Sequence, residues 1–309
     1  MRNQLTLLFL TLLLASACDE DSFSQVVDIP LPDHDPLPAL SLFLQARDTV
    51  AYPLLGISRG ILEEPDFSTY REGIIELYRN DVLIARDTQN ANASFSFRRE
   101  LLPLATPVST EAATFRLVGL VEGFEPVEAI QEMPAPPVID AIEYEEDGAI
   151  DQEGFRVDEL NFDIIDPPGE TNYYAFRVGV ATRDCEYFAD RDTVICAVDP
   201  SGQITRSYFL QSPDPLLQGG LSDDLLISDQ SFDGQRYRIR LLVESFRDEP
   251  PILEVQQLTE DAYRYGISYA AYLEAGDNPF AEPVQVHANV EGGYGAFVVA
   301  NKILRQLTE

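Results

Sequence analysis

Apart from carboxylates, the chain has few of the side chains that commonly catalyse reactions or bind metals. The 309 residues include 53 acidic residues, three cysteines and no tryptophan, and His34 and His287 are the two histidines. We expect a solvated side chain at His34 and a local hydrogen bond at His287. The G-x-S-x-G, H-E-x-x-H and phosphate-binding glycine motifs are absent from the sequence. We therefore predict no catalytic residues and no cofactor.

Carboxylates keep two other chemistries open. A glycan hydrolase needs only two acids roughly 5 to 10 Å apart, and so acidic a chain supplies such pairs by chance. Calcium prefers hard oxygen ligands, and an acidic stretch offers Asp223, Asp224, Asp229 and Asp233. These aspartates lack the alternate spacing of an EF-hand loop. We therefore favour a role in capping turns, predict no metal site, and keep them as a weak calcium candidate.

The first cysteine lies at the end of a leader. The apolar run from Leu5 to Leu14 follows Arg2, and small residues precede Cys18. This order is typical of a signal peptide, here residues 1–17, and the run is shorter than the about 20 residues that span a bilayer. It resembles a bacterial lipobox, so we expect Cys18 to carry acyl chains that anchor the protein in a membrane. An ordinary secreted protein is the alternative.

The residues after Cys18 form a predicted tether, 18–38. Asp19, Glu20 and Asp21 resemble the acidic export tag of surface lipoproteins, with a solvated linker as the alternative. The proline-rich stretch LPDHDPLPAL favours an extended backbone.

The other two cysteines form an even pair if Cys18 is lipidated. Cys185 and Cys196 bracket a predicted turn, so two reversing strands would bring them together as a disulfide. Zinc is the alternative, but it needs two further ligands from a chain with two histidines.

The charge is strongly acidic, at −32. Such a chain repels phosphate backbones and anionic headgroups, so nucleic acid is excluded as a partner. Lys302 is the only lysine among 21 basic residues. Either a saline habitat or a genome rich in arginine codons explains this composition.

Short apolar runs separated by turn residues predict a mainly β protein. Runs such as ALSLFLQA, GIIELYRN, DVLIARDT, ASFSFRRE and ATFRLVGLVEG predict an immunoglobulin-like β-sandwich over 39–134, with a tight turn at Asn80-Asp81. The proline-rich MPAPPVID ends it. Residues 135–309 predict a second β-rich domain with one packed helix over 259–276, where Thr259 is placed to cap. The helix tyrosines Tyr263, Tyr265, Tyr269 and Tyr272 cannot all face inward, so we expect one or two of them to mark a partner surface, with packing in the core as the alternative.

The second half carries an ordered set of motifs. PPVID leads to the turn Asp166-Pro167-Pro168-Gly169, then to Asn172-Tyr173-Tyr174, the tyrosine-rich helix, NPFAEP and a glycine-rich ending at Phe297. This order resembles a Bacteroidota lipoprotein family described as a domain of unknown function, of the DUF four-two-four-nine type. The resemblance implies surface lipoproteins encoded beside TonB-dependent outer-membrane transporters. It implies no catalytic residues.

These observations predict a non-enzymatic lipoprotein of the outer membrane, facing the cell exterior. We expect it to bind a TonB-dependent transporter, or another outer-membrane protein, in nutrient capture. A glycan-active enzyme using carboxylates and a structural or assembly subunit of an outer-membrane complex are the alternatives.

Overall fold

Strands make up most of the computed structural model, as the sequence predicts. The structure describes residues 34–60, 70–92, 102–188, 193–198, 203–220, 223–244, 251–276, 282 and 284–307. Contacts divide the chain into the units Met1–Asp35 and Pro36–Glu309. Everything below concerns the second unit.

The largest element of this unit is a 12-stranded sheet. Its strands are β1 (Pro38–Gln45), β3 (Leu54–Ile57), β4 (Tyr70–Arg79), β5 (Val82–Asn92), β7 (Thr114–Val121), β8 (Val127–Glu132), β11 (Tyr173–Val180), β14 (Arg206–Ser207), β16 (Gln218–Gly219), β17 (Leu225–Ser228), β19 (Ile252–Leu258) and β20 (Phe297–Gln306). They follow the order β16-β17-β11-β19-β20-β1-β3-β5-β4-β7-β8, and β14 pairs with β11 beside this path. The mainly β prediction is confirmed.

The remaining strands form smaller sheets. A four-stranded sheet contains β9 (Ile139–Ile150), β10 (Arg156–Ile165), β15 (Phe209–Gln211) and β18 (Arg236–Glu244), in the order β15-β18-β10-β9. Two-stranded sheets are formed by β12 (Thr182–Phe188) with β13 (Thr193–Val198), and by β2 (Val50–Ala51) with β6 (Leu102–Pro103). A short 3₁₀ helix, η2, covers Asp229–Ser231.

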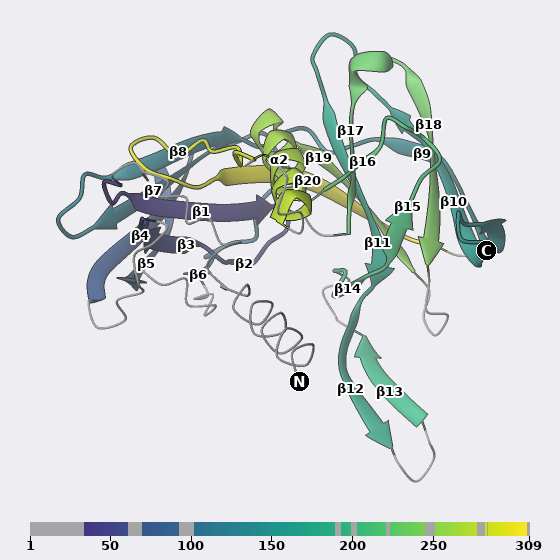
Figure 1. The fold of residues 1–309 in the computed structure, drawn as a ribbon, viewed down its shortest axis with the longest axis horizontal. Helices are drawn as coiled ribbons and strands as arrows, with labels where there is room; N and C mark the ends of the chain where they lie inside the picture. The colour runs from purple at the N-terminus through teal and green to yellow at the C-terminus, as the bar shows by residue number, and fades with distance from the viewer. Residues whose placement is uncertain are drawn as a thin grey trace, which may run out of the picture. The chain divides into compact units, whose positions relative to one another are not determined.

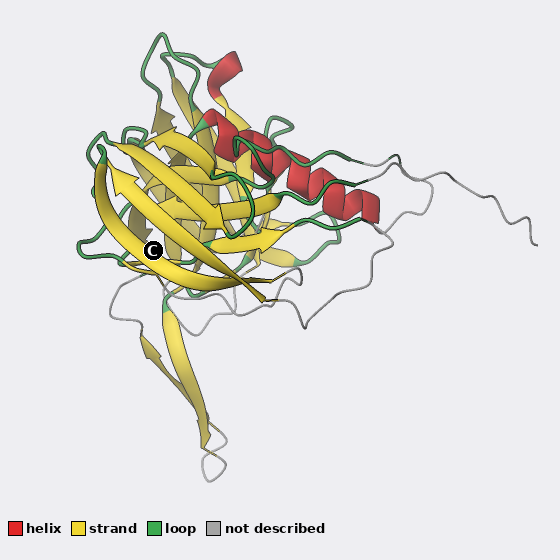
Figure 2. Cartoon of the chain, turned by 90° about the vertical axis from the view of Figure 1, so that its left-hand side faces the viewer, coloured by secondary structure: helices red, strands yellow, loops and turns green. Residues whose placement is uncertain are grey.

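The predicted helix is confirmed as α2 (Glu260–Gly276). Thr259 caps it, because its Oγ1 accepts the N–H of Ala262 at 3.3 Å. Figure 2 shows this helix lying against the strands. Among the residues described, no helix combines the length and hydropathy needed to cross a bilayer.

The predicted turn between β4 and β5 is also confirmed. Asn80 and Asp81 have positive φ values of 48° and 62°. Asparagine and aspartate tolerate this left-handed region, and two such residues in succession match the twist of a two-residue hairpin.

Strand β20 joins the first and second halves of the chain. It runs parallel to β1 and antiparallel to β19 (Figure 1, yellow between purple and green). One face of β20 contributes Phe297 and Val299 to a core made mainly by residues 40–133, and Ile303 further along packs on a second core made by residues 160–307.

Asn301 lies between these two contributions of β20. Its Nδ2 donates to the carbonyls of Thr110 at 2.8 Å and Pro134 at 2.9 Å. The predicted boundary at residue 134 separates most residues of the first core from those of the second. The 12-stranded sheet nevertheless contains strands from both sides of this boundary.

The glycine-rich segment before β20 connects the far edge of the sheet back to β1. Glu291 pairs with Glu128 of β8, and Tyr294 pairs with Ala39 of β1. A Cβ at Gly293 would lie 2.3 Å from the Pro38 carbonyl oxygen, so only glycine allows this close approach. The segment thus closes the first core with main-chain hydrogen bonds.

Candidate partner surface

The first turn of α2 is fixed by a polar network around Asp261. Its Oδ2 accepts hydrogen bonds from Gln131 at 2.6 Å and Asn289 at 3.1 Å, and its Oδ1 lies 2.7 Å from Nε2 of His287. Burial works to raise the pKa of Asp261, but the hydrogen bonds from His287, Gln131 and Asn289 outweigh it and lower that pKa. His287 thus makes a hydrogen bond, but its partner lies 26 residues away in the chain, so the prediction of a local bond is wrong.

The middle of the helix packs closely on the sheet. Ala262 and Gly266 are buried, and a Cβ at Gly266 would lie 2.8 Å from Leu226 Cδ1. The ring of Tyr263 lies 4.8 Å from that of Tyr173 on β11. A small residue at position 266 therefore sets how closely the helix approaches β17.

The end of the helix differs, because its side chains are exposed. Tyr265, Tyr269 and Tyr272 form a row with ring centroids 5.8 and 6.1 Å apart. Tyr272 is 50% exposed and Leu273 is 48% exposed. We call Tyr269, Tyr272 and Leu273 the helix tail.

The four tyrosines of the predicted partner surface are thus divided by the structure. Tyr263 and Tyr265 pack against the core beneath the helix, Tyr269 is half-buried, and Tyr272 is exposed. Exposed aromatic and aliphatic side chains on a rigid element are typical of a protein-binding surface.

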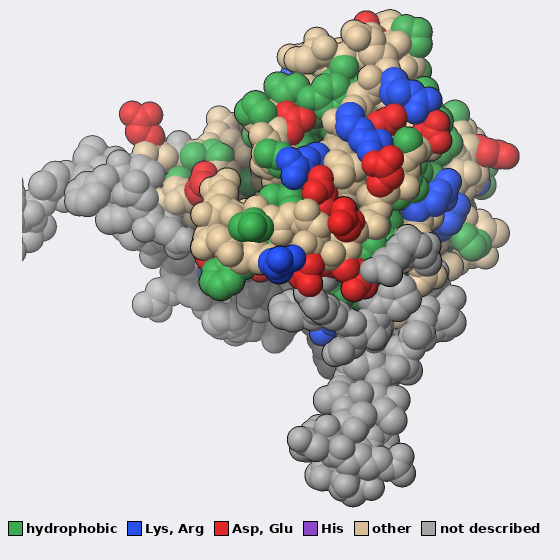
Figure 3. Space-filling view, turned by 90° about the vertical axis from the view of Figure 1, so that its right-hand side faces the viewer, with side chains coloured by type: hydrophobic (Ala, Val, Ile, Leu, Met, Phe, Trp, Pro, Cys, Tyr) green, Lys and Arg blue, Asp and Glu red, His purple; other side chains and the backbone are tan. Residues whose placement is uncertain are grey.

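A second exposed feature lies on the outer face of the four-stranded sheet. Figure 3 shows acidic and basic side chains interleaved on this side of the molecule. We call the set the charge ladder, and it comprises Asp140, Glu143, Glu159, Asp163, Arg236, Arg238 and Arg240.

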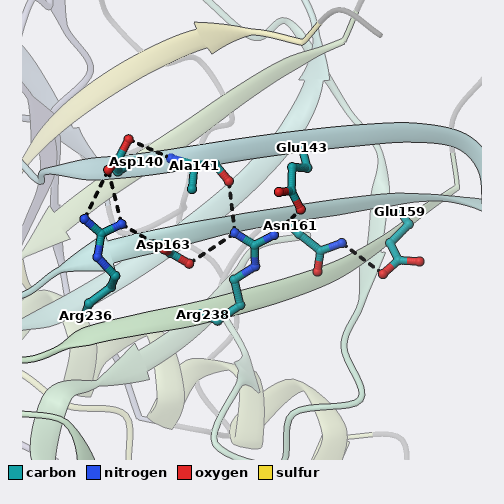
Figure 4. Close-up of polar contacts among 8 residues, drawn as sticks. All are labelled: Asp140, Ala141, Glu143, Glu159, Asn161, Asp163, Arg236 and Arg238. Atoms are coloured by element: carbon teal, nitrogen blue, oxygen red, sulfur yellow. Dashed lines mark hydrogen bonds and ion pairs between the residues drawn. The ribbon is translucent and has the colours of Figure 1, made fainter.

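Asp163 is the centre of the charge ladder (Figure 4). It accepts from Arg236 at 2.9 Å and from Arg238 at 3.2 Å. Arg236 also contacts Asp140 at 3.1 Å, and Arg238 continues to Glu143. Hydrogen bonds, first of all from Arg236, lower the pKa of Asp163. Because its arginines are already paired, the ladder is an ordered surface rather than a free anion site.

Sequence reasoning missed the charge ladder, although a signal was present. Arg236, Arg238 and Arg240 alternate along β18, so their side chains share one face. Glu159 and Asp163 alternate in the same way on β10. Their pairing across strands could not be read from the chain, because the strand order was unknown.

An acidic cluster lies at one end of β11, where Asp166, Asp229 and Asp233 place carboxylate oxygens within 4.8 Å of one another. Two of the four weak calcium candidates, Asp229 and Asp233, thus meet Asp166 of the predicted turn. Asp223 and Asp224 do not belong to this group.

Each carboxylate of this acidic cluster already accepts a backbone N–H. Asp166 accepts from Gly234, Asp229 from Asn172, and Asp233 from Gly169, all at 2.8 Å. Burial, opposed by the bonds from Asn172, raises the pKa of Asp229. Three such oxygens could coordinate a hard cation, but each already accepts a backbone N–H from a segment 57 to 68 residues away, so these aspartates join separate segments of the chain.

The Tyr174 hydroxyl joins the acidic cluster to the second core. It donates to Asp166 Oδ1 at 2.6 Å, and burial followed by this bond raises the pKa of Tyr174. Asn172 is held in turn by Gln257, whose Nε2 donates to Asn172 Oδ1 at 2.6 Å. These buried hydrogen bonds hold the turn at 166–169, one of the motifs that resemble the family, against the sheet.

Two sets of predicted residues cannot be placed in full. Cys18, Asp19, Glu20 and Asp21 lie outside the described residues. For the cysteine pair the backbone is described, and Cys185 lies opposite Cys196 in the β12–β13 ladder. The disulfide itself stays a prediction.

Together the fold and its surfaces define a mainly β protein that exposes a helix tail and a charge ladder. The chain matches the family model described as Domain of unknown function (DUF4249) over residues 109–303 and belongs to this family. The resemblance of the second half to this domain of unknown function is confirmed.

Other comparisons are distant. The B domain of a biofilm associated protein aligns with 88% of this chain and 85% of its own, at 6% identity and a TM-score of 0.18. A collagen adhesin from S. aureus aligns with 89% of this chain and 96% of its own, at 7% identity and a TM-score of 0.18. TM-scores of 0.18 are too low to indicate a shared fold or function. No curated protein matches the chain.

Proposed function

We propose that the protein is a non-enzymatic lipoprotein of the outer membrane that binds a protein partner through the helix tail. Acyl chains on Cys18 would hold it in the membrane, with the body facing the cell exterior. The partner would be a TonB-dependent transporter, or another outer-membrane protein, engaged in nutrient capture. Two immunoglobulin-like sandwiches, over 39–134 and 135–309, are the finer architecture that goes with this proposal.

The helix tail is the observation that carries the proposal. Tyr272 and Leu273 are half-exposed at the end of a helix whose first turn is fixed by Asp261. A rigid element with exposed aromatic groups lowers the entropy cost of binding. Membership of the family and the lipobox-like leader support the same proposal.

Co-purification from detergent-solubilised outer membranes tests the partner. We expect the tagged protein to recover a transporter or another outer-membrane protein, and Tyr272→Ser with Leu273→Ser to lose most of it. Val82→Ser with Leu83→Ser is the matched control, since these residues are 64% and 44% exposed on a different element. Recovery of the protein alone, or equal loss in both double variants, would contradict the proposal.

Acyl-chain labelling tests the anchor separately. Labelling with a fatty-acid analogue should disappear in Cys18→Ser, whereas Cys185→Ser should keep it. Labelling retained in Cys18→Ser would sink the lipid attachment without touching the helix tail.

A further inference from the structure

Strand β9 forms one edge of the four-stranded sheet. Among the described residues it pairs with β10 alone, so one side of its main chain faces no other strand. In an antiparallel sheet, the N–H and C=O groups of alternate residues point away from the neighbouring strand. Such an edge is a template on which a further strand can form hydrogen bonds.

Two irregular residues bound the open part of this edge. Ala141 and Asp147 adopt positive φ values of 50° and 53°, and the register with β10 shifts near both. Their main-chain groups are already used within the chain. Arg238 donates to the Ala141 carbonyl at 3.0 Å, and Asp158 Oδ1 accepts the Asp147 N–H at 2.9 Å. Because such bulges end strand pairing, the regular stretch is 142–146, which we call the β9 edge and which is about 17 Å long.

The charges of β9 are all of one sign. The strand contains no basic residue, and its acidic residues are Asp140, Glu143, Glu145, Glu146 and Asp147. Glu143 lies opposite Asn161 and Glu145 lies opposite Glu159, so both glutamates are on the face of the sheet that carries the charge ladder. The β9 edge therefore presents an acidic row beside its open main chain.

The charge ladder does not neutralise this row. Figure 4 shows the arginines on β18, acids on β10 and acids again on β9. Arg238 reaches across β10 to Glu143, whereas Arg240 ends on Glu159 at 2.8 Å. The Glu145 side chain lies opposite Glu159 and makes no ion pair with another residue of the described ranges. Like charges directly opposite each other are destabilising, so a cation beside Glu145 would be favourable.

Charge also decides what this edge can accept. A second copy of the chain would bring either its own acidic β9, which repels, or another end strand of the two larger sheets. Those strands, β8, β15 and β16, contain no basic residue. A strand with arginine or lysine at alternate positions instead places cations beside Glu143 and Glu145 on one face. The net charge of −32 attracts such a strand from a distance.

We propose that the β9 edge binds an extended segment of a partner protein that carries arginine or lysine at alternate positions, and adds it to the four-stranded sheet as a further strand. Main-chain hydrogen bonds supply the affinity. Ion pairs with Glu143 and Glu145 set the register and exclude acidic strands. This binding needs neither the helix tail nor the anchor, so it stands apart from the function proposed above.

Binding of short peptides to the full-length chain tests the charge pattern. The probe is a fluorescein-labelled peptide of seven residues in which arginine alternates with threonine or valine, and anisotropy measures its affinity at low ionic strength. We expect this alternating peptide to bind, and its counterpart with glutamate in place of arginine not to bind. A peptide of the same composition with its three arginines in succession should bind about tenfold more weakly.

Two N-methylated versions of the alternating peptide test strand addition itself. Each is methylated on every second peptide nitrogen, and the two versions differ by one residue in frame. A strand directs its N–H groups alternately to its two sides, so one frame should lose about tenfold or more in affinity and the other should not. Binding of the unmethylated peptide should slow hydrogen exchange in 142–146.

Glu143→Gln with Glu145→Gln tests the acidic row. This double variant should weaken binding of the alternating peptide about tenfold, because it removes both charges and keeps the size of the side chains. Glu111→Gln with Glu125→Gln is the matched control, since it removes the same charge from exposed residues on other segments. The control should bind as the wild type.

A wild-type chain that does not bind the alternating peptide would overturn the proposal, and the acids of β9 would then serve only to keep sheet edges of different molecules apart. Equal binding of the peptide with successive arginines, or of both N-methylated frames, would show attraction without strand addition and overturn it too. Equal weakening in the two double variants would assign the binding to net charge and overturn it as well.

Discussion

The charge ladder and the buried ion pairs of Lys302 with Glu254 and Asp48 use the same kinds of contact in opposite settings. In the ladder the arginines are 40% to 53% exposed, whereas Lys302 and Glu254 are each 2% exposed. Water and salt screen the exposed pairs, so each contributes little. Burial removes that screening but adds a desolvation cost. Removing one partner of a buried pair therefore lowers the unfolding free energy by far more than the intact pair contributes to it.

The largest effect is expected from Glu254→Gln. The substitution leaves Lys302 and Arg177 without their shared carboxylate, so the unfolding free energy should fall by about 3–5 kcal/mol. Urea denaturation followed by circular dichroism measures this. A loss below about 1 kcal/mol would mean that the buried cluster behaves like the exposed ladder.

A double variant separates the lost pair from the stranded charge. Glu254→Leu with Lys302→Met replaces both fully buried groups by apolar ones, and leaves only the more exposed Arg177 and Asp48, at 20% and 17%, without their partners. The double variant should therefore be more stable than Glu254→Gln. If it is equally unstable, packing rather than charge explains the loss.

The next effect concerns pH. Asp48→Asn should raise the unfolding free energy above about pH 6 by up to about 3 kcal/mol, because the wild type pays to ionise a carboxyl whose pKa rises from 3.8 to about 6. The gain should shrink as the pH falls from 6 towards 3.8, since both states of the wild type then bind the proton. Urea denaturation across this range measures the difference; a gain independent of pH would count against Asp48 as its source.

Sequence reasoning reached the local elements of the structure but not their partners. The strands, the Asn80-Asp81 turn and helix α2 depend on neighbouring residues, whose propensity and spacing the chain displays. The contact between Gln45 and Lys302 joins residues 257 positions apart, and the parallel pairing of β1 with β20 that creates it leaves no local signal.

The acidic residues show the same limit. Four aspartates between 223 and 233 were considered as one calcium candidate. In the structure two of them, Asp229 and Asp233, meet Asp166, which directly follows β10. Spacing along the sequence could not select the right partners, because the aspartates meet only after β10, β11 and β17 take their places. The charge ladder was missed for this reason too.

A smaller effect is expected in the charge ladder. Arg238→Gln removes contacts to Asp163 and Glu143, yet the arginine is 40% exposed and Glu143 is 68% exposed. The unfolding free energy should change by less than about 1 kcal/mol, and less still at high salt. Urea denaturation at low and high ionic strength checks this. A large loss that salt leaves unchanged would place the ladder with the buried cluster.

The smallest effect separates the two clusters by sign. The hydrogen bonds from Arg236 and Arg238 lower the pKa of Asp163, whereas burial raises that of Asp48. A carboxyl with a lowered folded pKa contributes stability above its unfolded pKa near 3.8, and loses it as the pH falls through the folded value. Asp163→Asn should therefore flatten the acid decline below about pH 4 and leave the range around pH 6 unchanged. If Asp163→Asn instead altered the slope near pH 6, Asp163 and Asp48 would not titrate independently, although Asp163 lies in the four-stranded sheet and Asp48 follows β1 of the 12-stranded sheet.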